Sequence, residues 1–274
     1  MKQVMNILIN YADSKYETAR KWNSRTGRWF GKFDKIYEFK PEDIDDEFRK
    51  AHIDILSIKR GNGAWLWKSY FIKRVIDSCN DGDYIMYVDS GAFFIRDPRM
   101  LFEYIDDNNP IFVTDIPLIE SNWTKPECFD IMDAWQFANT NQIQSGFIIF
   151  KVNKISRDFF DEYYILSSTT QMLVPAGLGK FDKVDHDFKE AFVSHREDQS
   201  ILSLLCKKKG IKAHRDISQR GFNPKSFYCK NYLYSVPLHP DDKYKTIVFL
   251  HKSTKLGPIF FARYIKNRIR EYFM

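Results

Sequence analysis

Short apolar segments that stop at polar residues recur along the chain, and they predict the strands of a sheet. The densest is Tyr84–Val88, which ends at Asp89. The first, at 6–10, has the pattern of a buried strand and ends in polar residues. The other strands are predicted at 33–39, 111–114, 145–150, 211–214 and 246–250.

Between these strands, apolar positions recur every three or four residues and predict helices. The pattern is strongest over 64–79, and the helix at 195–209 ends in three lysines before Gly210. Strands that alternate with helices predict an α/β fold with a largely parallel sheet, in a single domain. The segment 171–194 is expected to be mostly loop, and further helices are predicted at 14–22, 42–50, 98–105 and 159–166.

The composition limits the classes of binding partner without selecting one of them. Among the 274 residues, 42 Lys and Arg face 36 Asp and Glu, and the net charge of +6 favours phosphates, nucleotides, nucleic acid or an anionic membrane. The apolar runs are far shorter than the about 20 residues that span a bilayer, and the first residues lack a signal-peptide pattern. The four cysteines show no paired spacing. We therefore expect a cytoplasmic protein without disulfides.

Lys68 has an unusual position, in the middle of the apolar face of the helix predicted at 64–79. A lysine there must extend to solvent or meet an anion. The start of a helix also attracts phosphate through its free N–H groups. The pattern therefore leaves two readings open, a lysine that reaches water and a lysine that binds phosphate.

Carboxylates at the ends of predicted elements are the next candidates. Asp89 follows a central apolar strand, where it would bind a cation or a hydrogen-bond donor, or would cap a turn. Ser194 and Glu197 have the spacing of a capping box, which gives Glu197 a structural role. Asp198 then faces the core and is a candidate catalytic or substrate-binding carboxylate next to the Gln199 amide; the alternative is a carboxylate stabilised by the helix dipole.

Two further candidate segments directly precede or follow predicted strands. His251 and Lys252 follow the strand at 246–250, where an imidazole can ligate a divalent metal or bind phosphate, although a lone histidine is often structural. The small residues of Gln144-Ser145-Gly146 precede another apolar strand and could let a sugar approach the backbone.

Taken in order, five segments resemble bacterial glycosyltransferases of the GT-A fold, of the type found in capsule and lipopolysaccharide gene clusters. The resemblance covers roughly residues 1–255. The segments are Gly63–Lys68, Asp81–Gly91, Gln144–Phe147, His195–Ser200 and Phe249–His251.

The resemblance implies a Rossmann-like, mixed but mostly parallel sheet flanked by helices. It implies transfer of a sugar from a nucleotide diphosphate sugar, UDP-linked, to a saccharide or lipid-linked acceptor in surface polysaccharide synthesis. By the same resemblance, the nucleoside lies at Asn10, Tyr11 and Ala12. The sugar lies at Gln144, Ser145 and Gly146, with Asp198 near the reacting carbon.

In that family a DxD motif holds manganese or magnesium on the donor diphosphate. This chain has Asp89-Ser90-Gly91, so Gly91 replaces the second acid. The resemblance therefore leaves two arrangements. Asp89 and His251 hold one divalent ion, or Lys68 and other basic groups carry the diphosphate without metal.

Two other functions compete with this interpretation. A sugar nucleotidyltransferase would carry a glycine-rich basic loop after its first strand, and residues 10–16 contain no glycine. A module that binds nucleic acid would gather its basic residues into one stripe, and here they are dispersed except at the C-terminus. We therefore rank both below a glycosyltransferase and expect no nucleic-acid partner.

The last segment, 256–274, is predicted to form a basic amphipathic helix over 259–273. It would pack on the domain or dock on an anionic membrane face as a peripheral contact. The segments 117–142, 171–193 and 218–245 are expected to be loops that select the acceptor. The predicted apolar stripe comprises Phe261, Ala262, Ile265, Ile269, Tyr272 and Phe273, and its basic border comprises Arg263, Lys266, Arg268 and Arg270.

Overall fold

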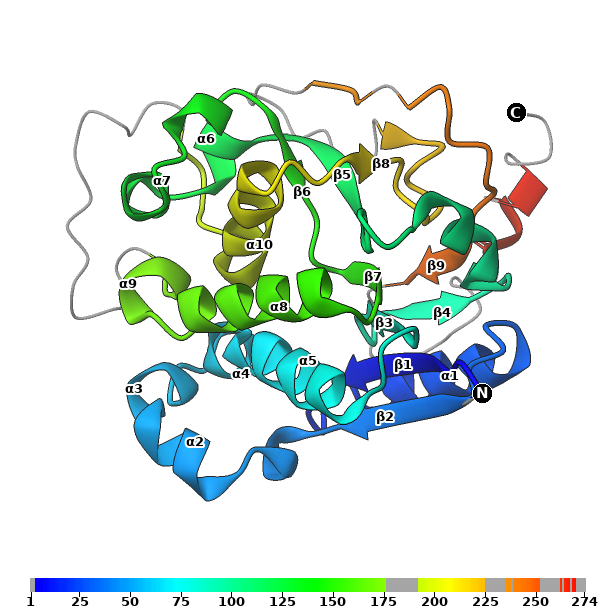
Figure 1. The fold of residues 1–274 in the computed structure, drawn as a ribbon, viewed down its shortest axis with the longest axis horizontal. Helices are drawn as coiled ribbons and strands as arrows, with labels where there is room; N and C mark the ends of the chain where they lie inside the picture. Colours follow the sequence, from blue (N-terminus) through cyan, green and yellow to red (C-terminus); the bar gives the residue numbers. More distant parts are fainter. Residues whose placement is uncertain are drawn as a thin grey trace.

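A seven-stranded mixed sheet forms the centre of the molecule in the computed structural model (Figure 1). Its strands lie in the order β2-β1-β3-β7-β5-β6, and β8 pairs with β5. The structure describes residues 3–175, 192–224, 235–237, 239–251, 262, 264–266, 268 and 269. The strands are β1 (Asn6–Tyr11), β2 (Lys35–Phe39), β3 (Tyr84–Val88), β5 (Ile111–Ile119), β6 (Asn141–Ile143), β7 (Phe147–Lys151) and β8 (Ala213–His214).

Strand direction decides which residues meet at one edge. β1 is parallel to β2 and β3, whereas β7 is antiparallel to both β3 and β5. β5 is in turn antiparallel to β6 and parallel to β8, so β1, β2, β3, β5 and β8 point one way and β6 and β7 the other. The predicted mixed, mostly parallel sheet is confirmed. The start of β7 therefore lies at the edge where β1 and β3 end.

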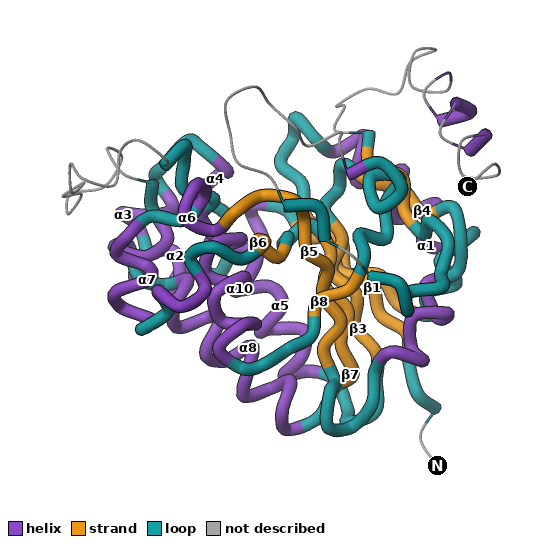
Figure 2. Tube along the Cα trace, turned by 90° about the horizontal axis from the view of Figure 1, so that it is seen from above, coloured by secondary structure: helices purple, strands orange, loops and turns teal. Residues whose placement is uncertain are grey.

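Helices cover both faces of the sheet, which is the central layer in Figure 2. The face toward α5 (Leu66–Ser78), α8 (Lys154–Ser167) and α10 (Glu197–Lys208) holds the larger core, and α1 (Glu17–Trp29) lies on the other side. The other helices are short: η1 (Pro41–Asp43), α2 (Asp46–Ala51), α3 (Ile53–Leu56), α4 (Gly61–Ala64), η2 (Pro98–Tyr104), α6 (Glu120–Trp123), α7 (Pro126–Met132), η3 (Trp135–Phe137) and α9 (Thr170–Leu173).

The apolar strands divide between the two cores by simple alternation. In β1, Ile7 and Ile9 join the core under α5, and Leu8 joins the opposite core. Successive side chains of a strand point to opposite faces, so a strand covered on both sides is apolar at every position. None of the helices in the described ranges is long and apolar enough to cross a membrane.

The structure corrects the predicted loop at 117–142. This segment contains the end of β5, α6, α7, η3 and β6. Its apolar positions, such as Cys128, Phe129 and Met132, are buried in the core, and the periodicity is too short to stand out in the sequence. In the segment predicted as loop at 171–194, residues 176–191 lie outside the described residues.

A two-stranded ribbon lies beside the main sheet. β4 (Ala92–Phe94) pairs antiparallel with β9 (Val248–Leu250), and this pairing joins the residues after β3 to the late part of the chain. Most of the predicted C-terminal helix lies outside the described residues. Within its described part, Ala262, Ile265 and Ile269 of the predicted apolar stripe are exposed, while the Tyr264 ring lies against Phe93 and Phe249.

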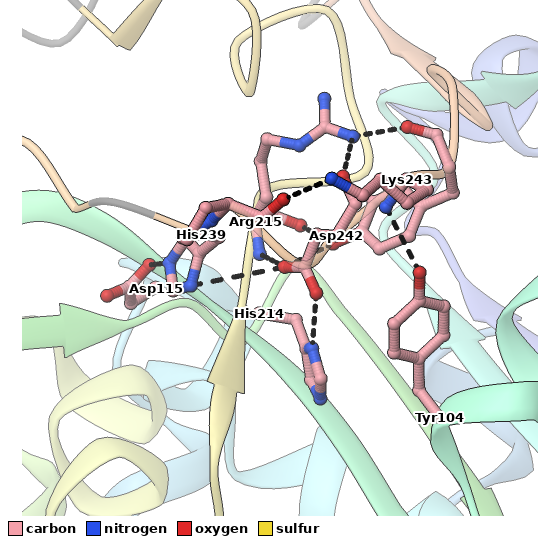
Figure 3. Close-up of polar contacts among 9 residues, drawn as sticks. Tyr104, Asp115, His214, Arg215, His239, Asp242 and Lys243 are labelled. Carbon is pink, nitrogen blue, oxygen red and sulfur yellow. Dashed lines mark hydrogen bonds and ion pairs between the residues drawn. The ribbon is translucent and has the colours of Figure 1, made fainter.

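A group of four side chains, here called the histidine–aspartate cluster, holds the segment before β9 to the sheet (Figure 3). His214 Nδ1 lies 2.9 Å from Asp242 Oδ1, and His239 Nε2 lies 2.7 Å from Asp115 Oδ1. The other Asp242 oxygen, Oδ2, accepts a hydrogen bond from the Arg215 backbone N–H at 2.6 Å. The cluster therefore consists of Asp115, His214, His239 and Asp242.

Candidate functional site: a cleft at the carboxyl edge of the sheet

A left-handed turn precedes α5 and forms one wall of the cleft. Five consecutive residues, Gly61 to Trp65, have positive φ. The predicted helix at 64–79 therefore begins at Leu66, because Ala64 and Trp65 belong to this turn. A Cβ added at Gly61 would overlap the Trp65 indole, and the Trp67 Nε1–H donates to the Gly61 carbonyl at 2.9 Å. Glycine is thus required where the indole closes over the backbone.

Aromatic side chains line a cavity of about 740 Å³ between this turn and the end of β1. Tyr11 stacks on Trp67 with ring centroids 3.7 Å apart, and Asn62 donates a hydrogen bond to the Tyr11 hydroxyl. A flat apolar wall of this size suits a nucleobase and ribose. The lining residues are Tyr11, Ala12, Asp13, Lys15, Tyr16, Lys59, Gly61, Asn62, Trp65, Trp67, Tyr87, Asp89, Ser90, Gly91 and Leu250.

Asn10 departs from the prediction for the nucleoside end of the site. Its side chain is fully buried and its amide donates to Asn23 Oδ1 and Ser24 Oγ of α1, each at 2.9 Å. In β1 alternate residues face opposite sides, so Asn10 points to α1 while Tyr11 points to the cavity. Ser90 contacts this end instead, since its hydroxyl donates to the Tyr11 carbonyl at 2.5 Å.

Lys68 lies at the centre of the site and is only 1% exposed. Its Nζ lies 2.6 Å from Asp198 Oδ2 and 3.7 Å from Asp89 Oδ1, and it donates to Ser145 Oγ at 2.9 Å. Burial would lower the pKa of Lys68, but the carboxylates of Asp198 and Asp89 raise it above its ordinary value, so the side chain is a cation. The interpretation that Lys68 extends to solvent is therefore wrong. The anion that Lys68 contacts is a carboxylate of the chain itself. We call Lys68, Asp89, Ser145 and Asp198 the lysine cluster.

Asp198 faces the core, as predicted, and is 4% exposed. Burial raises the pKa of Asp198, and the ammonium of Lys68 acts against that shift. The Tyr163 hydroxyl lies 3.4 Å from its Oδ2. Asp198 is thus held from two sides, by α5 and by α8.

Asp89 keeps an open side. Its side chain is 44% exposed and lines both cavities of the cleft. The Tyr87 hydroxyl donates to Asp89 Oδ1 at 2.6 Å, and burial raises the pKa of Tyr87 well above its ordinary value, so the phenol remains a donor. Tyr87 precedes Asp89 by two residues on β3, and this period-two spacing was a readable signal that the sequence analysis missed.

A second cavity, of about 360 Å³, adjoins the first through Trp65, Asp89 and Leu250, which line both. The predicted sugar segment reaches it because β7 runs antiparallel and begins at this edge. Gly146 lies close to Asp89, whose backbone N–H donates to the Gly146 carbonyl at 2.8 Å. The lining residues are Arg60, Trp65, Lys68, Asp89, Ile116, Trp123, Gln144, Ser145, Gly146, Phe147, Ser194, Arg196, Glu197, Asp198, Gln199, Arg220 and Leu250.

The amide of Gln199 is oriented by its neighbours in this second cavity. Its Nε2 donates to Gln142 Oε1 at 2.6 Å, and its Oε1 accepts from the Ser145 backbone N–H at 3.4 Å. Gln144 is fixed in the same way, because its Nε2 donates to Thr114 Oγ1 at 2.7 Å. Both amides therefore present a defined orientation to a ligand.

The predicted capping box at Ser194 and Glu197 is wrong. α10 begins at Glu197, which has a positive φ of 42°, and Arg196 occupies the N-cap position without a side-chain cap. Glu197 instead forms an ion pair with Arg60 across the mouth of the cleft. Burial raises the pKa of Glu197, and Arg60 opposes that shift. The arginine comes from a distant loop, so local spacing could not reveal this pair.

His251 lies beside the Asp89-Ser90-Gly91 segment, because its backbone N–H donates to the Gly91 carbonyl at 2.8 Å. The neighbouring residue Leu250 lines both cavities, but His251 is not among the described residues that line either of them. Lys252 lies outside the described residues. Within the described part of the chain, no group of three or more His, Cys, Asp or Glu side chains is placed to hold a metal ion.

Neither a protein-family model nor a curated protein sequence matches the chain. Solved structures do match. The chain is similar to mouse xyloside xylosyltransferase 1, with 8% identity and a TM-score of 0.50 over 92% of this chain and 100% of that one. It is also similar to the glycosyltransferase GlyE of Streptococcus pneumoniae, with 14% identity and a TM-score of 0.46 over 97% of this chain and 60% of that one.

A third similar structure is the galactosyltransferase LgtC, with 14% identity and a TM-score of 0.46 over 92% of this chain and 87% of that one. The chain thus spans about three fifths of the GlyE structure, all of the xylosyltransferase structure and most of the LgtC structure. These neighbours are glycosyltransferases of the GT-A type. The likeness to the xylosyltransferase, over 92% of this chain, shows that the chain has the GT-A fold in a single domain.

Proposed function

We propose that this protein is a glycosyltransferase that moves a sugar from a nucleotide diphosphate sugar, UDP-linked, to a saccharide or lipid-linked acceptor in surface polysaccharide synthesis. The observation that carries the proposal is the two-part cleft at the carboxyl edge of the sheet. Asp89 lies where an aromatic-walled cavity meets a cavity that contains Asp198 and Gln199. The GT-A fold of the chain is consistent with this chemistry.

The donor would occupy both cavities. The nucleoside would lie against Tyr11 and Ala12, and the diphosphate would pass Asp89, Ser90 and Gly91 into the smaller cavity. Because Lys68 is already paired with Asp198, it is not the cation for the diphosphate. Lys15 and Lys59 line the larger cavity and supply positive charge there.

A divalent cation is part of the proposal. Asp89 offers a half-exposed carboxylate, and the His251 backbone N–H bonds to the carbonyl of Gly91, two residues after Asp89; in the proposal, Asp89 and His251 would hold manganese or magnesium. The ion would neutralise the departing diphosphate. Only two protein ligands are offered, so a hard divalent ion would take its other ligands from the diphosphate and water. We therefore expect weaker metal dependence than two acidic ligands would give.

In the transfer step, the bond between the anomeric carbon and the diphosphate breaks, and a bond to an acceptor oxygen forms. The proton of the acceptor hydroxyl passes to an oxygen of the departing diphosphate, and the nucleoside diphosphate leaves. Positive charge develops at the anomeric carbon in the transition state, where nearby carboxylates and oriented amides stabilise it. Lys68 holds the Asp198 carboxylate in place, and Gln142 orients the Gln199 amide toward the same cavity.

The proposal places the enzyme in the cytoplasm, with the helix predicted at 259–273 as a peripheral contact with the inner face of the membrane. The exposed side chains of Ile265 and Ile269 support such a contact. A lipid-linked acceptor would be within reach of an enzyme held at that surface.

Calorimetric titration with UDP-, GDP- and CMP-sugars, with and without Mn²⁺, tests the proposal. We expect binding of a UDP-sugar and release of UDP when an acceptor is added. The substitution Asp89→Asn should weaken donor binding at least tenfold. The matched control is Asp158→Asn, which removes an exposed carboxylate on α8 far from the cleft. If no nucleotide sugar binds, or both variants bind as the parent does, the proposal fails.

A further inference from the structure

The outer face of α1 presents large aromatic side chains to solvent. Trp29 and Phe30, at the end of the helix, are 54% and 50% exposed, and Trp22, half-buried, lies about two turns before Trp29 on the same side. Isolated exposed apolar residues are ordinary, but neighbouring exposed aromatic residues mark an interaction surface.

The exposed side chains of this segment are mostly basic: Lys21, Arg25, Arg28 and Lys32 are exposed, whereas Arg20 is half-buried and donates to the Phe39 carbonyl at 2.8 Å. From 17 to 32 the chain has five basic residues and one acidic residue, a net charge of +4. The Arg25 guanidinium lies 5.1 Å from the Trp22 ring and 6.0 Å from the Trp29 ring, so one cation sits between two indoles. The basic residues are Arg20, Lys21, Arg25, Arg28 and Lys32, and the acidic one is Glu17.

The inner face of α1 shows that these aromatic side chains are not needed to hold the helix. It docks on the molecule through small and polar residues. Asn23 Nδ2 donates to the Ala92 carbonyl at 2.9 Å, and Thr26 Oγ1 accepts from the Phe94 N–H at 3.0 Å. A Cβ added at Gly27 would lie 2.8 Å from the Leu8 side chain, so this face packs closely on β1. Trp22 and Trp29 therefore lie on the opposite side from the core, and Phe30 follows at the C-cap, where it is 50% exposed.

A second exposed apolar group lies at the same end of the molecule. The described C-terminal helical residues appear at this end in Figures 1 and 2, and Ile265 and Ile269 there are 57% and 54% exposed. They connect to α1 through the ribbon. Tyr264 lies against Phe93 of β4, and the next residue, Phe94, bonds to α1.

We propose that the outer face of α1 binds an anionic lipid surface. Indole rings favour the headgroup region of a bilayer, and lysine and arginine beside them are attracted to anionic lipid phosphates. A nucleic acid fits less well, because base stacking needs an open aromatic face and Arg25 lies over both indoles. This surface is separate from the cleft, so the inference does not depend on the proposed reaction.

Vesicle flotation with the full chain tests the inference. We expect binding to vesicles of phosphatidylcholine with one quarter phosphatidylglycerol, weaker binding to phosphatidylcholine alone, and a decrease at high salt. The double substitution Trp29→Ser/Phe30→Ser should lower the partition coefficient at least tenfold. The matched control is Ile155→Ser/Ile165→Ser, which removes two exposed apolar side chains from α8. All four positions are exposed, so the thermal transition of each variant should match that of the parent.

Two further measurements separate α1 from the C-terminal helix. Ile265→Ser/Ile269→Ser in the full chain leaves α1 intact, so the loss from the α1 substitutions should persist in this background. Brominated lipid should quench tryptophan emission in the parent, and Trp29→Phe should remove part of that quenching. Equal partitioning of the parent and the α1 double variant overturns the inference. The inference is also overturned if the parent protein binds single-stranded RNA but not anionic vesicles, and the α1 double variant loses the RNA binding.

Discussion

The lysine cluster and the histidine–aspartate cluster both place carboxylates next to basic side chains away from bulk water, yet they differ in what remains open. In the histidine–aspartate cluster, Asp242 is 2% exposed at its side chain. One oxygen meets His214 and the other meets the Arg215 N–H, so its hydrogen-bonding capacity is occupied (Figure 3).

In the lysine cluster, the Asp198 side chain is also buried, at 6% exposed, but Asp89 is 44% exposed and faces two cavities. The difference separates two uses of a carboxylate. One that is saturated by the chain holds the chain together, and one that is fixed on a single side can receive a ligand on the other. The predictions below test this difference through the free energy of unfolding, from the largest effect to the smallest.

Lys68→Met should have the largest effect. It keeps most of the side-chain volume but leaves the buried Asp198 carboxylate without its cation, which costs about 3–5 kcal/mol. Urea unfolding measures the loss. Lys73→Met is the control, since its ion pairs are more exposed and should contribute less than about 1 kcal/mol. The double variant Lys68→Met/Asp198→Asn should recover part of the loss, and a wild-type unfolding midpoint for Lys68→Met would refute the buried-pair interpretation.

Asp242→Asn should come next. The amide can replace only part of the hydrogen bonding to His214 and Arg215, and hydrogen bonds to a charged group contribute about 1.5–3 kcal/mol. Stability should fall by that amount while affinity for a donor nucleotide sugar stays at the parent value, since this cluster is saturated. Calorimetric titration of the variant checks the second half, and weakened donor binding would show that the cluster also serves the cleft.

The two clusters should respond to pH in opposite directions. Burial would raise the pKa of Asp242, but hydrogen bonds from His214 and Arg215 lower it overall. Its contribution is present above the unfolded pKa of about 3.9 and is lost as pH falls through the folded value. The pKa of Lys68 is raised, so its contribution is complete below about 10.4 and is lost as pH rises through the folded value. Melting curves of Asp242→Asn should approach the parent in acid, and those of Lys68→Met should approach it in alkali; parallel curves at every pH would contradict this.

Asp89→Asn should have the smallest effect on stability, below about 1 kcal/mol, because the side chain is half-exposed and its distance to Lys68 Nζ is 3.7 Å. Its effect on transfer should be large, since the proposal places the diphosphate beside it. Product formation and urea unfolding on the same sample provide the test. A large loss of stability with normal transfer would reverse the roles assigned to the two clusters.

The sequence was informative where burial alone decides the outcome. The apolar run at Tyr84–Val88 predicted β3 with its observed bounds and placed Asp89 at its end. The position of Lys68 on an apolar face marked the residue as unusual but left solvent and phosphate open as its surroundings, and the structure shows a carboxylate instead. Its partner, Asp198, lies far along the chain, and no local pattern encodes which distant carboxylate reaches a given lysine.

Other parts of the site depend on the direction of a strand or on a left-handed backbone conformation. The residue types in a segment are poor predictors of either. The apolar pattern of β7 fits a parallel or an antiparallel strand equally well, yet its direction brings Gln144 and Gly146 to the cleft. The side chain of Asn10 faces α1 through the register of β1, which a short apolar run leaves undefined. The capping spacing at Glu197 was misleading because Arg60, on another segment, competes for the carboxylate.

The turn from Gly61 to Trp65 has a consequence in terms of chirality. L-amino acids disfavour the left-handed region by about 1–2 kcal/mol per residue, and here Asn62, Ala64 and Trp65 all occupy it in sequence. One wall of the larger cavity is thus built in the mirror-image hand of the helix that follows it. A D-alanine introduced at position 64 by chemical ligation would suit this backbone better than the natural residue does. At this wall of the cleft, the chirality of L-amino acids therefore disfavours the backbone conformation that the chain adopts. The packing of Trp65 and Trp67 stabilises that conformation.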